Sequence, residues 1–147
     1  MVGLIVLWEE ILYVYLLAND SFGWSGKYSY LFPGKGWEQK EYDDSLWKEG
    51  NGAFGPVKEN FKVRTAWGAE NIYVRRHIKI DNKDALEGHK MYVCYNCDDQ
   101  VRLFWNGDFL GEKGITYQTK CECLPDEAIT RIYNGDNVLA VYGRNTG

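Results

Sequence analysis

The chain consists mainly of short runs in which apolar and polar residues alternate. The clearest run is 71–81, where every second residue is apolar with the exception of Arg76. A period of two places neighbouring side chains on opposite faces of a strand, so this run predicts a half-buried β-strand. The face expected to point inward carries Ile72, Val74, Arg76, Ile78 and Ile80.

Residues 94–111, CYNCDDQVRLFWNGDFLG, predict a β-hairpin. Asn106 and Gly107 stand between two apolar runs, and a type I′ turn needs a positive φ at both of its central positions, which this pair adopts readily. On the strand before the turn, one face is expected to hold Leu103 and Trp105, and the other Arg102 and Phe104.

Three further runs are expected to be strands, namely 90–97, 114–124 and 137–145. Each combines apolar, aromatic and β-branched residues and is bounded by Gly, Asn or Asp. In the run 114–124, the alternation predicts that one side carries Ile115, Tyr117, Thr119, Cys121 and Cys123.

The segment 124–137, LPDEAITRIYNGDN, predicts the one helix of the chain. Pro125 suits the first turn of a helix, and the acidic Asp126 and Glu127 favour its positive N-terminal end. Gly135 is expected to end the helix after about two turns.

The N-terminal residues are apolar but do not predict a membrane span. Residues 3–8 and 11–17 are expected to be strands or strand-like pieces, because Glu9 and Glu10 interrupt the apolar run. Two carboxylates in a membrane span would be costly, and the segment lacks the positive start of a signal peptide. We expect residues 1–20 to be the end of a preceding region and residues 21–147 to form the domain.

Turn signals recur about every ten residues, as in PGKGW (33–37), YDDSLWKEG (42–50) and NGAFGPVKEN (51–60). Pro fixes φ, Gly allows a positive φ, and Asp and Ser accept hydrogen bonds from nearby backbone N–H groups. Many short strands with a single short helix predict an all-β fold, an antiparallel β-sandwich of the jelly-roll type.

Composition limits the function classes. The 147 residues are 45% hydrophobic and 16% aromatic, which is enough for one domain with its own core. The net charge is −4, and lysine and arginine are scattered along the chain. A nucleic-acid-binding protein needs a basic face, so nucleic acid is not expected as a partner.

The cysteines form a CxxC and a CxC pair, which raises the question of zinc. Residues three apart on a strand point to opposite faces, so one cysteine of the first pair is expected to face the core rather than a shared ion. We expect buried free thiols, with a disulfide across adjacent strands as the second alternative and zinc as the least favoured. The residues concerned are Cys94, Cys97, Cys121 and Cys123.

Paired aspartates and two histidines are the other candidates for chemistry. A glycosidase needs two carboxyl groups facing each other across a cleft, about 5–10 Å apart. Adjacent aspartates in turns are instead expected to cap backbone N–H groups, and no serine or cysteine stands in a triad context. We therefore expect no catalytic residue in this chain. The residues considered are Asp43, Asp44, Asp98, Asp99, His77 and His89.

Aromatic residues in or beside loops are candidates for ligand contact, because sugar rings stack their C–H faces on Trp and Tyr. Trp67 is the strongest candidate, since it lies in RTAWGAEN among polar residues. Trp37 and Trp47 are expected to pack in the core instead. The candidate ligand-binding residues are Trp67, Arg64, Glu70, Asn71, Trp24 and Tyr117.

Four stretches in order, GWEQKEYDDSLWKEGNGAFG, TAWGAENIYVRRHIKI, DDQVRLFWNGDFLG and GDNVLAVYGRNTG, carry a family resemblance. Residues 24–147 resemble the galactose-binding-domain-like β-sandwich modules of large secreted bacterial hydrolases. Two kinds of host carry such modules. They are the glutaminase A-like proteins and the family 2 glycoside hydrolases of the β-galactosidase group.

The resemblance implies an accessory, non-catalytic module of a secreted or periplasmic hydrolase, with the neighbouring catalytic domain and a carbohydrate as partners. The alternative is a scaffold that orients the catalytic domain and binds no sugar. No cofactor is implied, although a structural calcium held by loop oxygens is left open. In the resembling modules a further strand follows the NTG sequence, so we expect the sandwich to be truncated at its C-terminal end.

Overall fold

The computed structural model describes residues 24–52, 54–55, 63–116, 118 and 120–146, together with the backbone of residues 2–7. The 3₁₀ helix η1 spans Lys83–Leu86 and the helix α1 spans Asp126–Thr130. The strands are β1 (Val2–Leu7), β2 (Trp24–Ser29), β3 (Lys48–Gly52), β4 (Phe54–Gly55), β5 (Thr65–Ala66), β6 (Asn71–Ile80), β7 (Lys90–Tyr95), β8 (Gln100–Trp105), β9 (Asp108–Lys113), β10 (Lys120–Cys123) and β11 (Gly135–Arg144).

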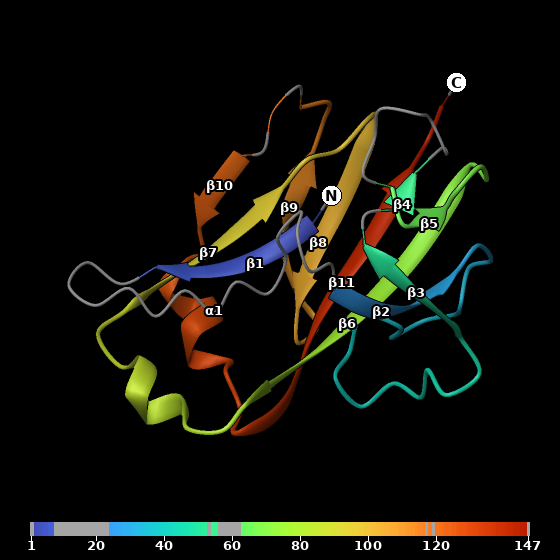
Figure 1. Cartoon of the computed structure of the whole chain (residues 1–147). Helices are drawn as coiled ribbons and strands as arrows, with labels where there is room; N and C mark the ends of the chain where they lie inside the picture. The colour runs from blue at the N-terminus through green and yellow to red at the C-terminus, as the bar shows by residue number, and fades with distance from the viewer. Residues whose placement is uncertain are drawn as a thin grey trace.

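Two antiparallel sheets form the sandwich, which confirms the predicted fold class. The larger sheet has the strand order β3-β2-β6-β11-β8-β9, and the smaller sheet has the order β1-β7-β10. Strands β4 and β5 form a small parallel pair beside them. In Figure 1 the long strands β6 and β11 lie side by side, and β1, β7 and β10 lie to their left.

The hydrophobic core lies between these two sheets. It joins Met91 and Val93 of β7 to Val74 of β6, Leu103 of β8 and Leu139 of β11. All of these positions follow the period of two that the sequence shows, because only one face of each strand is turned toward the other sheet.

The strand predicted for residues 71–81 is confirmed as β6. Ile72, Val74 and Ile78 are buried, and Arg76 is buried with them on the inward face. The Arg76 guanidinium lies 5.1 Å from the centre of the Trp24 ring. Burial lowers the pKa of Arg76 to about 10. The long side chain therefore takes part in core packing.

The hairpin at Asn106 and Gly107 is confirmed, with φ angles of 48° and 93°. The Asn106 side chain also anchors the turn, because its Nδ2 donates to the carbonyl of Arg131 at 2.6 Å and to Oδ1 of Asn137 at 2.9 Å. Its Oδ1 accepts from the backbone N–H of Val138 at 2.8 Å. Before the turn, Leu103 and Trp105 are fully buried, and Arg102 and Phe104 lie on the opposite face.

The helix is shorter than predicted. Helix α1 covers Asp126–Thr130, and Gly135 is the first residue of β11 rather than the end of a helix. The buried side chain of Asn137 accepts a hydrogen bond from the N–H of Tyr133 at 2.9 Å and donates to its carbonyl at 2.8 Å. These bonds hold the backbone of Tyr133 in a non-helical conformation, so the helix ends early.

The strand predicted over residues 114–124 is also shorter, since β10 contains only Lys120–Cys123. Residues 114–116 lie outside it, and Ile115 is 52% exposed. The N–H of Thr116 bonds to the carbonyl of Cys97 at 2.9 Å, in a loop contact rather than a sheet ladder. Tyr117 and Thr119, which were predicted to share a face of this strand, lie outside the described residues.

The expectation of free thiols holds only for part of the cysteine set. Cys94 and Cys121 form a disulfide between β7 and β10, where the register places them directly opposite each other. Cys97 is a buried free thiol that donates to the carbonyl of Gly114 at 2.8 Å, and burial raises its pKa. Cys123 is free and exposed. The second alternative, a disulfide across adjacent strands, is therefore correct for Cys94 and Cys121.

The N-terminal strand pairs with the smaller sheet, since β1 runs antiparallel to β7. This confirms a strand within residues 3–8, whereas the strand predicted for residues 11–17 lies outside the described residues. The domain boundaries stay predictions. In the part of the chain that the structure describes, no helix has the length and apolar character needed to cross a membrane.

Candidate functional site

The outer face of the larger sheet, which points away from the core, is the face on which the strands carry aromatic side chains. Tyr73 of β6, Phe104 of β8 and Tyr142 of β11 all lie there, and they pack around the fully buried Ala140. The face of a sheet that points to solvent normally carries polar residues, so this group of aromatic rings is unusual. We call it the outer aromatic face.

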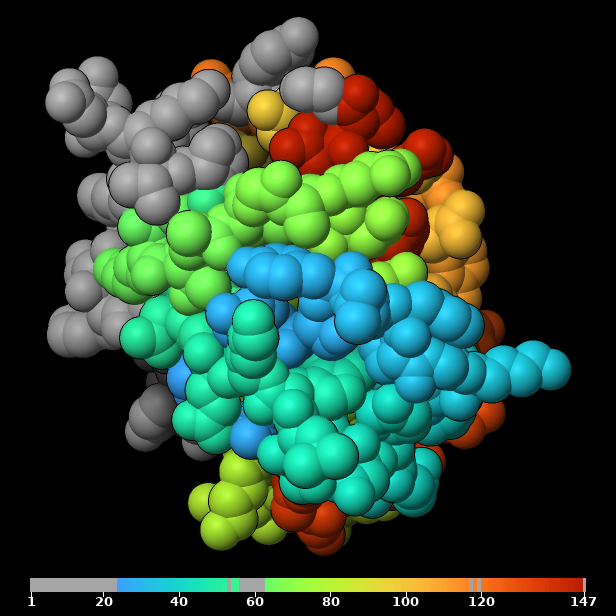
Figure 2. All heavy atoms as spheres, turned by 90° about the vertical axis from the view of Figure 1, so that its right-hand side faces the viewer, coloured from blue at the N-terminus to red at the C-terminus, as the bar shows by residue number. Residues whose placement is uncertain are grey.

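A loop covers the centre of this face. Trp37 is only 6% exposed and makes edge contacts with Tyr73 and Phe104, at ring-centre distances of 5.2 and 5.7 Å. Trp47 stacks on Trp37 at 6.3 Å. The small side chain of Ala140 leaves room for Trp37 on the sheet. In Figure 2 residues 24–52, drawn in blue to teal, cover the middle of this side of the molecule.

Arg75 holds that loop to the sheet. Its side chain is completely buried, and its guanidinium donates to the backbone carbonyls of Trp37, Gln39 and Tyr42. Its Nε donates to Oδ2 of Asp44 at 2.7 Å. Because arginine offers five donors in a planar arrangement, a single residue can pair with several carbonyls and a carboxylate at once.

A histidine lies between two carboxylates beside Arg75. His77 Nε2 is 2.7 Å from Oδ2 of Asp44, and His77 Nδ1 is 2.7 Å from Oδ2 of Asp136. Burial favours neutral His77, but the hydrogen bonds to both carboxylates outweigh it and raise the pKa of His77. Burial also disfavours a charged Asp44, yet the hydrogen bonds from Arg75 and His77 hold the pKa of Asp44 below its ordinary value.

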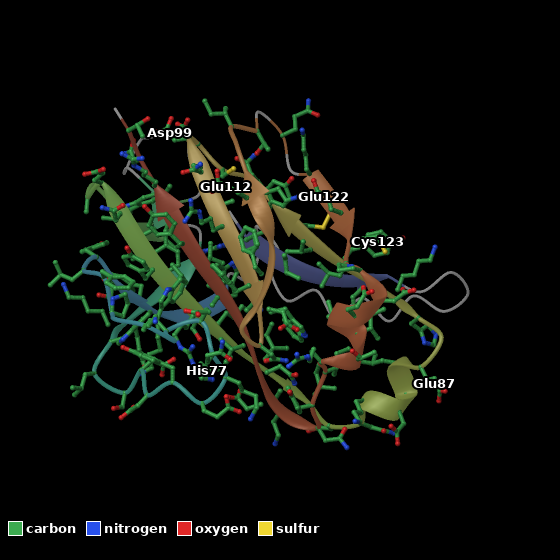
Figure 3. The ribbon with its side chains drawn as sticks, turned by 180° about the vertical axis from the view of Figure 1, so that it is seen from behind. His77, Glu87, Asp99, Glu112, Glu122 and Cys123 are labelled. Carbon is green, nitrogen blue, oxygen red and sulfur yellow. A yellow bond between two sulfur atoms is a disulfide. The ribbon has the colours of Figure 1, made fainter. Side chains whose placement is uncertain are left out.

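This cluster links the covering loop to strands β6 and β11. Asp44 was expected to cap backbone N–H groups, but its carboxylate pairs with Arg75 and His77 instead, because the buried guanidinium needs a counter-charge. Asp43 does act as a cap and accepts from the N–H of Ser45 at 2.9 Å. Figure 3 shows His77 well away from Asp99, whose carboxylate accepts from the N–H of Thr146.

A row of partly and fully exposed side chains crosses four strands beside the covering loop. Tyr73 of β6 is opposite Tyr142 of β11, Tyr142 is opposite Arg102 of β8, and Arg102 is opposite Glu112 of β9. Phe32 adds a ring at the end of the row, 5.8 Å from Tyr73, and is 67% exposed. We call these five residues the aromatic–polar row.

The row changes from rings to hydrogen-bonding groups along its length. The Tyr73 and Tyr142 rings are 5.1 Å apart, and the Arg102 guanidinium lies 5.9 Å from the Tyr142 ring. Arg102 Nε donates to Glu112 at 2.6 Å, and the side chains of this pair are 50% and 41% exposed. The row therefore presents flat apolar surface at one end and planar polar groups at the other.

The structure places the sequence-predicted Trp residues mainly in packing roles. Trp24 is 7% exposed and belongs to the core. Trp67 is half-buried against the core, and its indole Nε1 is buried without a hydrogen-bond partner among the described residues. A Cβ added at Gly143 would lie 3.1 Å from the Trp67 ring, so the ring lies directly over the backbone there.

The polar candidates pair with other parts of the chain. Arg64 donates to the carbonyl of Gly52 at 3.0 Å, and Glu70 forms an ion pair with Arg144 at 3.2 Å. Asn71 Oδ1 accepts from the hydroxyl of Tyr142 at 2.8 Å, which places Asn71 beside the aromatic–polar row. Tyr117 lies outside the described residues. Ligand contact by this set stays a prediction.

Sequence reasoning did not identify the aromatic–polar row. The available signal was that Tyr73 and Tyr142 stand at positions of β6 and β11 that alternate with the core-facing residues, where polar residues are expected. Neither residue lies in a loop, so neither belongs to the loop aromatics that the sequence suggests for sugar contact.

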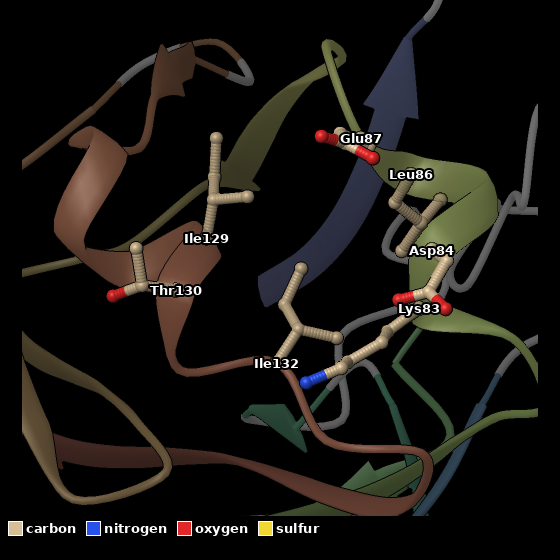
Figure 4. A pocket seen from close by; sticks show the side chains of 7 residues that line it. All are labelled: Lys83, Asp84, Leu86, Glu87, Ile129, Thr130 and Ile132. Carbon is tan, nitrogen blue, oxygen red and sulfur yellow. The ribbon is translucent and has the colours of Figure 1, made fainter.

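Other features of the described residues offer less. No group of three or more His, Cys, Asp or Glu side chains among them is arranged to hold a metal ion. Figure 4 shows an open pocket of about 310 Å³ between η1 and α1. Its lining mixes Lys83, Asp84 and Glu87 with Leu86, Ile129, Thr130 and Ile132.

Comparison with solved structures places this fold among glycoside hydrolases. A β-glycosidase from Bacteroides vulgatus superposes with a TM-score of 0.59 at 20% identity, over 82% of this chain and 16% of its own. A β-glucuronidase from glycoside hydrolase family 2 superposes with a TM-score of 0.64 at 15% identity, over 99% of this chain and 14% of its own.

A calcium-binding mutant of Bacteroides uniformis β-glucuronidase 2 gives a TM-score of 0.58 at 16% identity, over 82% of this chain and 14% of its own. No protein-family model matches the sequence, and no curated protein matches it. The chain therefore has the fold of a domain found in family 2 glycoside hydrolases, and it spans about a sixth of the length of those proteins.

Proposed function

We propose that this chain is a non-catalytic accessory domain of a larger glycoside hydrolase and that it binds carbohydrate. The observation that carries the proposal is the match in fold, which extends over 82% to 99% of this chain but only 14% to 16% of the glycosidases. Those proteins need most of their length for other domains, so a unit of this size is suited to assist a catalytic domain rather than replace it.

Carbohydrate is the favoured ligand because of the side chains on the outer face. Flat rings can stack on the apolar face of a sugar, while Arg102 and Glu112 offer donors and acceptors for hydroxyl groups. Asn71, from the candidate set derived from the sequence, joins these residues through its bond to Tyr142. Trp67 and its neighbours are the second candidate site for carbohydrate contact.

The alternative function is a scaffold that packs against the catalytic domain of the same polypeptide and binds no sugar. Exposed aliphatic residues on the covering loop favour this alternative. Leu31 is 79% exposed and Leu46 is 97% exposed. Isolated exposed leucines are common on protein surfaces, so they weigh less than an ordered row of rings with polar neighbours.

We propose a host that is secreted or periplasmic. The disulfide between Cys94 and Cys121 supports this proposal, because disulfides persist in oxidising compartments. A glutaminase A-like host remains the second proposal for the parent protein. We propose no resident cofactor, and the alternative is a structural calcium ion in the host, since one of the similar structures is a calcium binding mutant of a β-glucuronidase.

Affinity gel electrophoresis of the purified chain tests the proposal. Native gels containing soluble galactomannan, xylan or mixed-linkage β-glucan are compared with gels that contain no polysaccharide. Retarded migration in at least one polysaccharide gel, without hydrolysis of 4-nitrophenyl glycosides, is the expected result. Unchanged migration in all of them would favour the scaffold. Hydrolysis by the chain alone would contradict the accessory role.

A further inference from the structure

We propose that the aromatic–polar row is the carbohydrate-binding surface of this domain and that its ligand is a neutral oligosaccharide lying across strands β6, β11, β8 and β9. This inference rests on the proposed function and specifies its site and ligand class. It involves residues on the outer sheet face, whereas the loop tryptophan Trp67 that the sequence singled out packs against the core.

The length of the row points to a chain of sugars rather than a single ring. Neighbouring strands are about 4.8 Å apart, so the four strands place Tyr73 and Glu112 about 14 Å from each other. Phe32 extends the row further at the Tyr73 end. A surface of this length can contact several successive units of an extended glycan.

The charge of the row points to a neutral ligand. Its charged members are Arg102 and Glu112, which pair at 2.6 Å and cancel each other. Gln100 donates to the same carboxylate through its side-chain amide. An acidic sugar would need an unneutralised cation here, whereas neutral hydroxyl groups can bond to both members of the pair.

A glycan fits the row better than a protein surface does. A protein partner would exclude water from the half-exposed Arg102–Glu112 pair, and the desolvation cost of burying an ion pair can exceed its Coulombic gain. Hydroxyl groups replace water around the pair without removing its hydrogen bonds.

Neighbouring residues of the outer face support the row from the side. Trp37 packs on Tyr73 by an edge contact, and the loop that carries Trp37 is held by the buried Arg75. Tyr142 is fixed by its hydroxyl bond to Asn71. Rings held in this way lose little conformational freedom when a ligand stacks on them, which favours binding.

Isothermal titration calorimetry with single variants tests the inference. The probes are cellohexaose, mannohexaose and xylohexaose, with glucose, mannose and xylose as monosaccharide controls. The variants Phe32→Ala and Arg102→Ala remove exposed members of the row. Phe109→Ala is the matched control, because Phe109 is a 59% exposed ring on the same face that contacts Phe104 and lies outside the row. Thermal melting of each variant checks that it folds.

We expect at least one hexasaccharide to bind, and each row variant to weaken its binding roughly tenfold, the loss typical of truncating one anchor residue. Phe109→Ala should change the dissociation constant of that hexasaccharide by less than about twofold, within the range of a neutral contact. Binding that both row variants leave unchanged would overturn the inference but leave the proposed carbohydrate function standing. Absence of binding to all three hexasaccharides would overturn the inference, and the carbohydrate function would fall with it only if migration is also unchanged in all the polysaccharide gels.

Discussion

At the scale of single residues, Arg75 determines how the outer face is arranged. It is the one fully buried charged side chain among the described residues, and it connects the sheet to residues more than thirty positions earlier in the sequence. Removing one member of a buried ion pair leaves the other member and its hydrogen-bond partners unsatisfied. The loop that covers the sheet therefore depends on this residue.

We predict that Arg75→Ala destabilises the domain by about 3–5 kcal/mol, the cost of breaking a buried charge pair from one side. Lys79→Ala is the matched control, because Lys79 is a cation on the same strand whose side chain is 80% exposed. Its replacement should change stability by less than about 0.5 kcal/mol. Urea unfolding followed by tryptophan fluorescence measures both, and similar losses for the two variants would refute the role of Arg75.

The His77 cluster predicts a pH dependence with a definite sign. The pKa of His77 is raised above 6.5, so its stabilising contribution is complete below pH 6.5 and is lost as pH rises through the folded-state pKa. The pKa of Asp44 is lowered below 3.8, so its contribution is present above pH 3.8 and is lost as pH falls through the folded-state value.

We predict that the melting temperature of the native chain falls as pH rises from 6.5 to alkaline values, because His77 loses its proton. The variant His77→Gln retains hydrogen-bonding groups without the charge, so its melting temperature should fall less over the same interval. Differential scanning calorimetry at a series of pH values compares the two. If both proteins show the same dependence between these pH values, His77 does not act in this way.

At the scale of elements, the disulfide and the hairpin fix the pairing of strands. Cys94 and Cys121 join the middle strand of the smaller sheet to an edge strand of only four residues. A strand this short makes few ladder bonds, so a covalent link contributes a large part of its attachment. The Asn106–Gly107 turn sets the register between β8 and β9 in a similar way, through backbone geometry.

We predict that replacing Cys94 and Cys121 together by alanine lowers stability by about 3–4 kcal/mol, from the entropy of the closed chain segment. The sequence separation that enters this estimate is 27 residues. Cys123→Ala is the control, because it removes an exposed free thiol from the same strand. Chemical denaturation measures the difference, and a stability of the double variant equal to that of Cys123→Ala would show that the disulfide contributes nothing.

We predict that replacing Asn106 and Gly107 by valine destabilises the fold by about 2–6 kcal/mol, since each β-branched residue is forced to a positive φ. A Cβ at Gly107 would also lie 2.3 Å from the Gln39 side chain. Gly114→Ala is the control, because its Cβ would meet no atom within 4 Å and its φ is not positive. An unchanged melting temperature for the valine variant would contradict the hairpin.

At the scale of the whole molecule, the sequence predicted local structure better than non-local contacts. Period-two alternation and turn chemistry identified β6, the hairpin and the sandwich, because these depend on neighbouring residues. The partner of Cys94 depends on the register of β7 against β10, which no local pattern encodes. The covering of the outer face depends on Arg75 reaching carbonyls of a distant loop, so the row beside that loop was not predicted.

The central claim, that this domain binds an oligosaccharide on its outer face, is tested most directly by NMR. Backbone amide spectra of the uniformly ¹⁵N-labelled chain are recorded during titration with the hexasaccharide that binds most tightly. We predict that the amides with the largest shifts lie in β6, β11 and β8, around Tyr73, Tyr142 and Arg102. Saturable shifts confined to other parts of the chain, or no shifts with any of the three hexasaccharides, would contradict the claim.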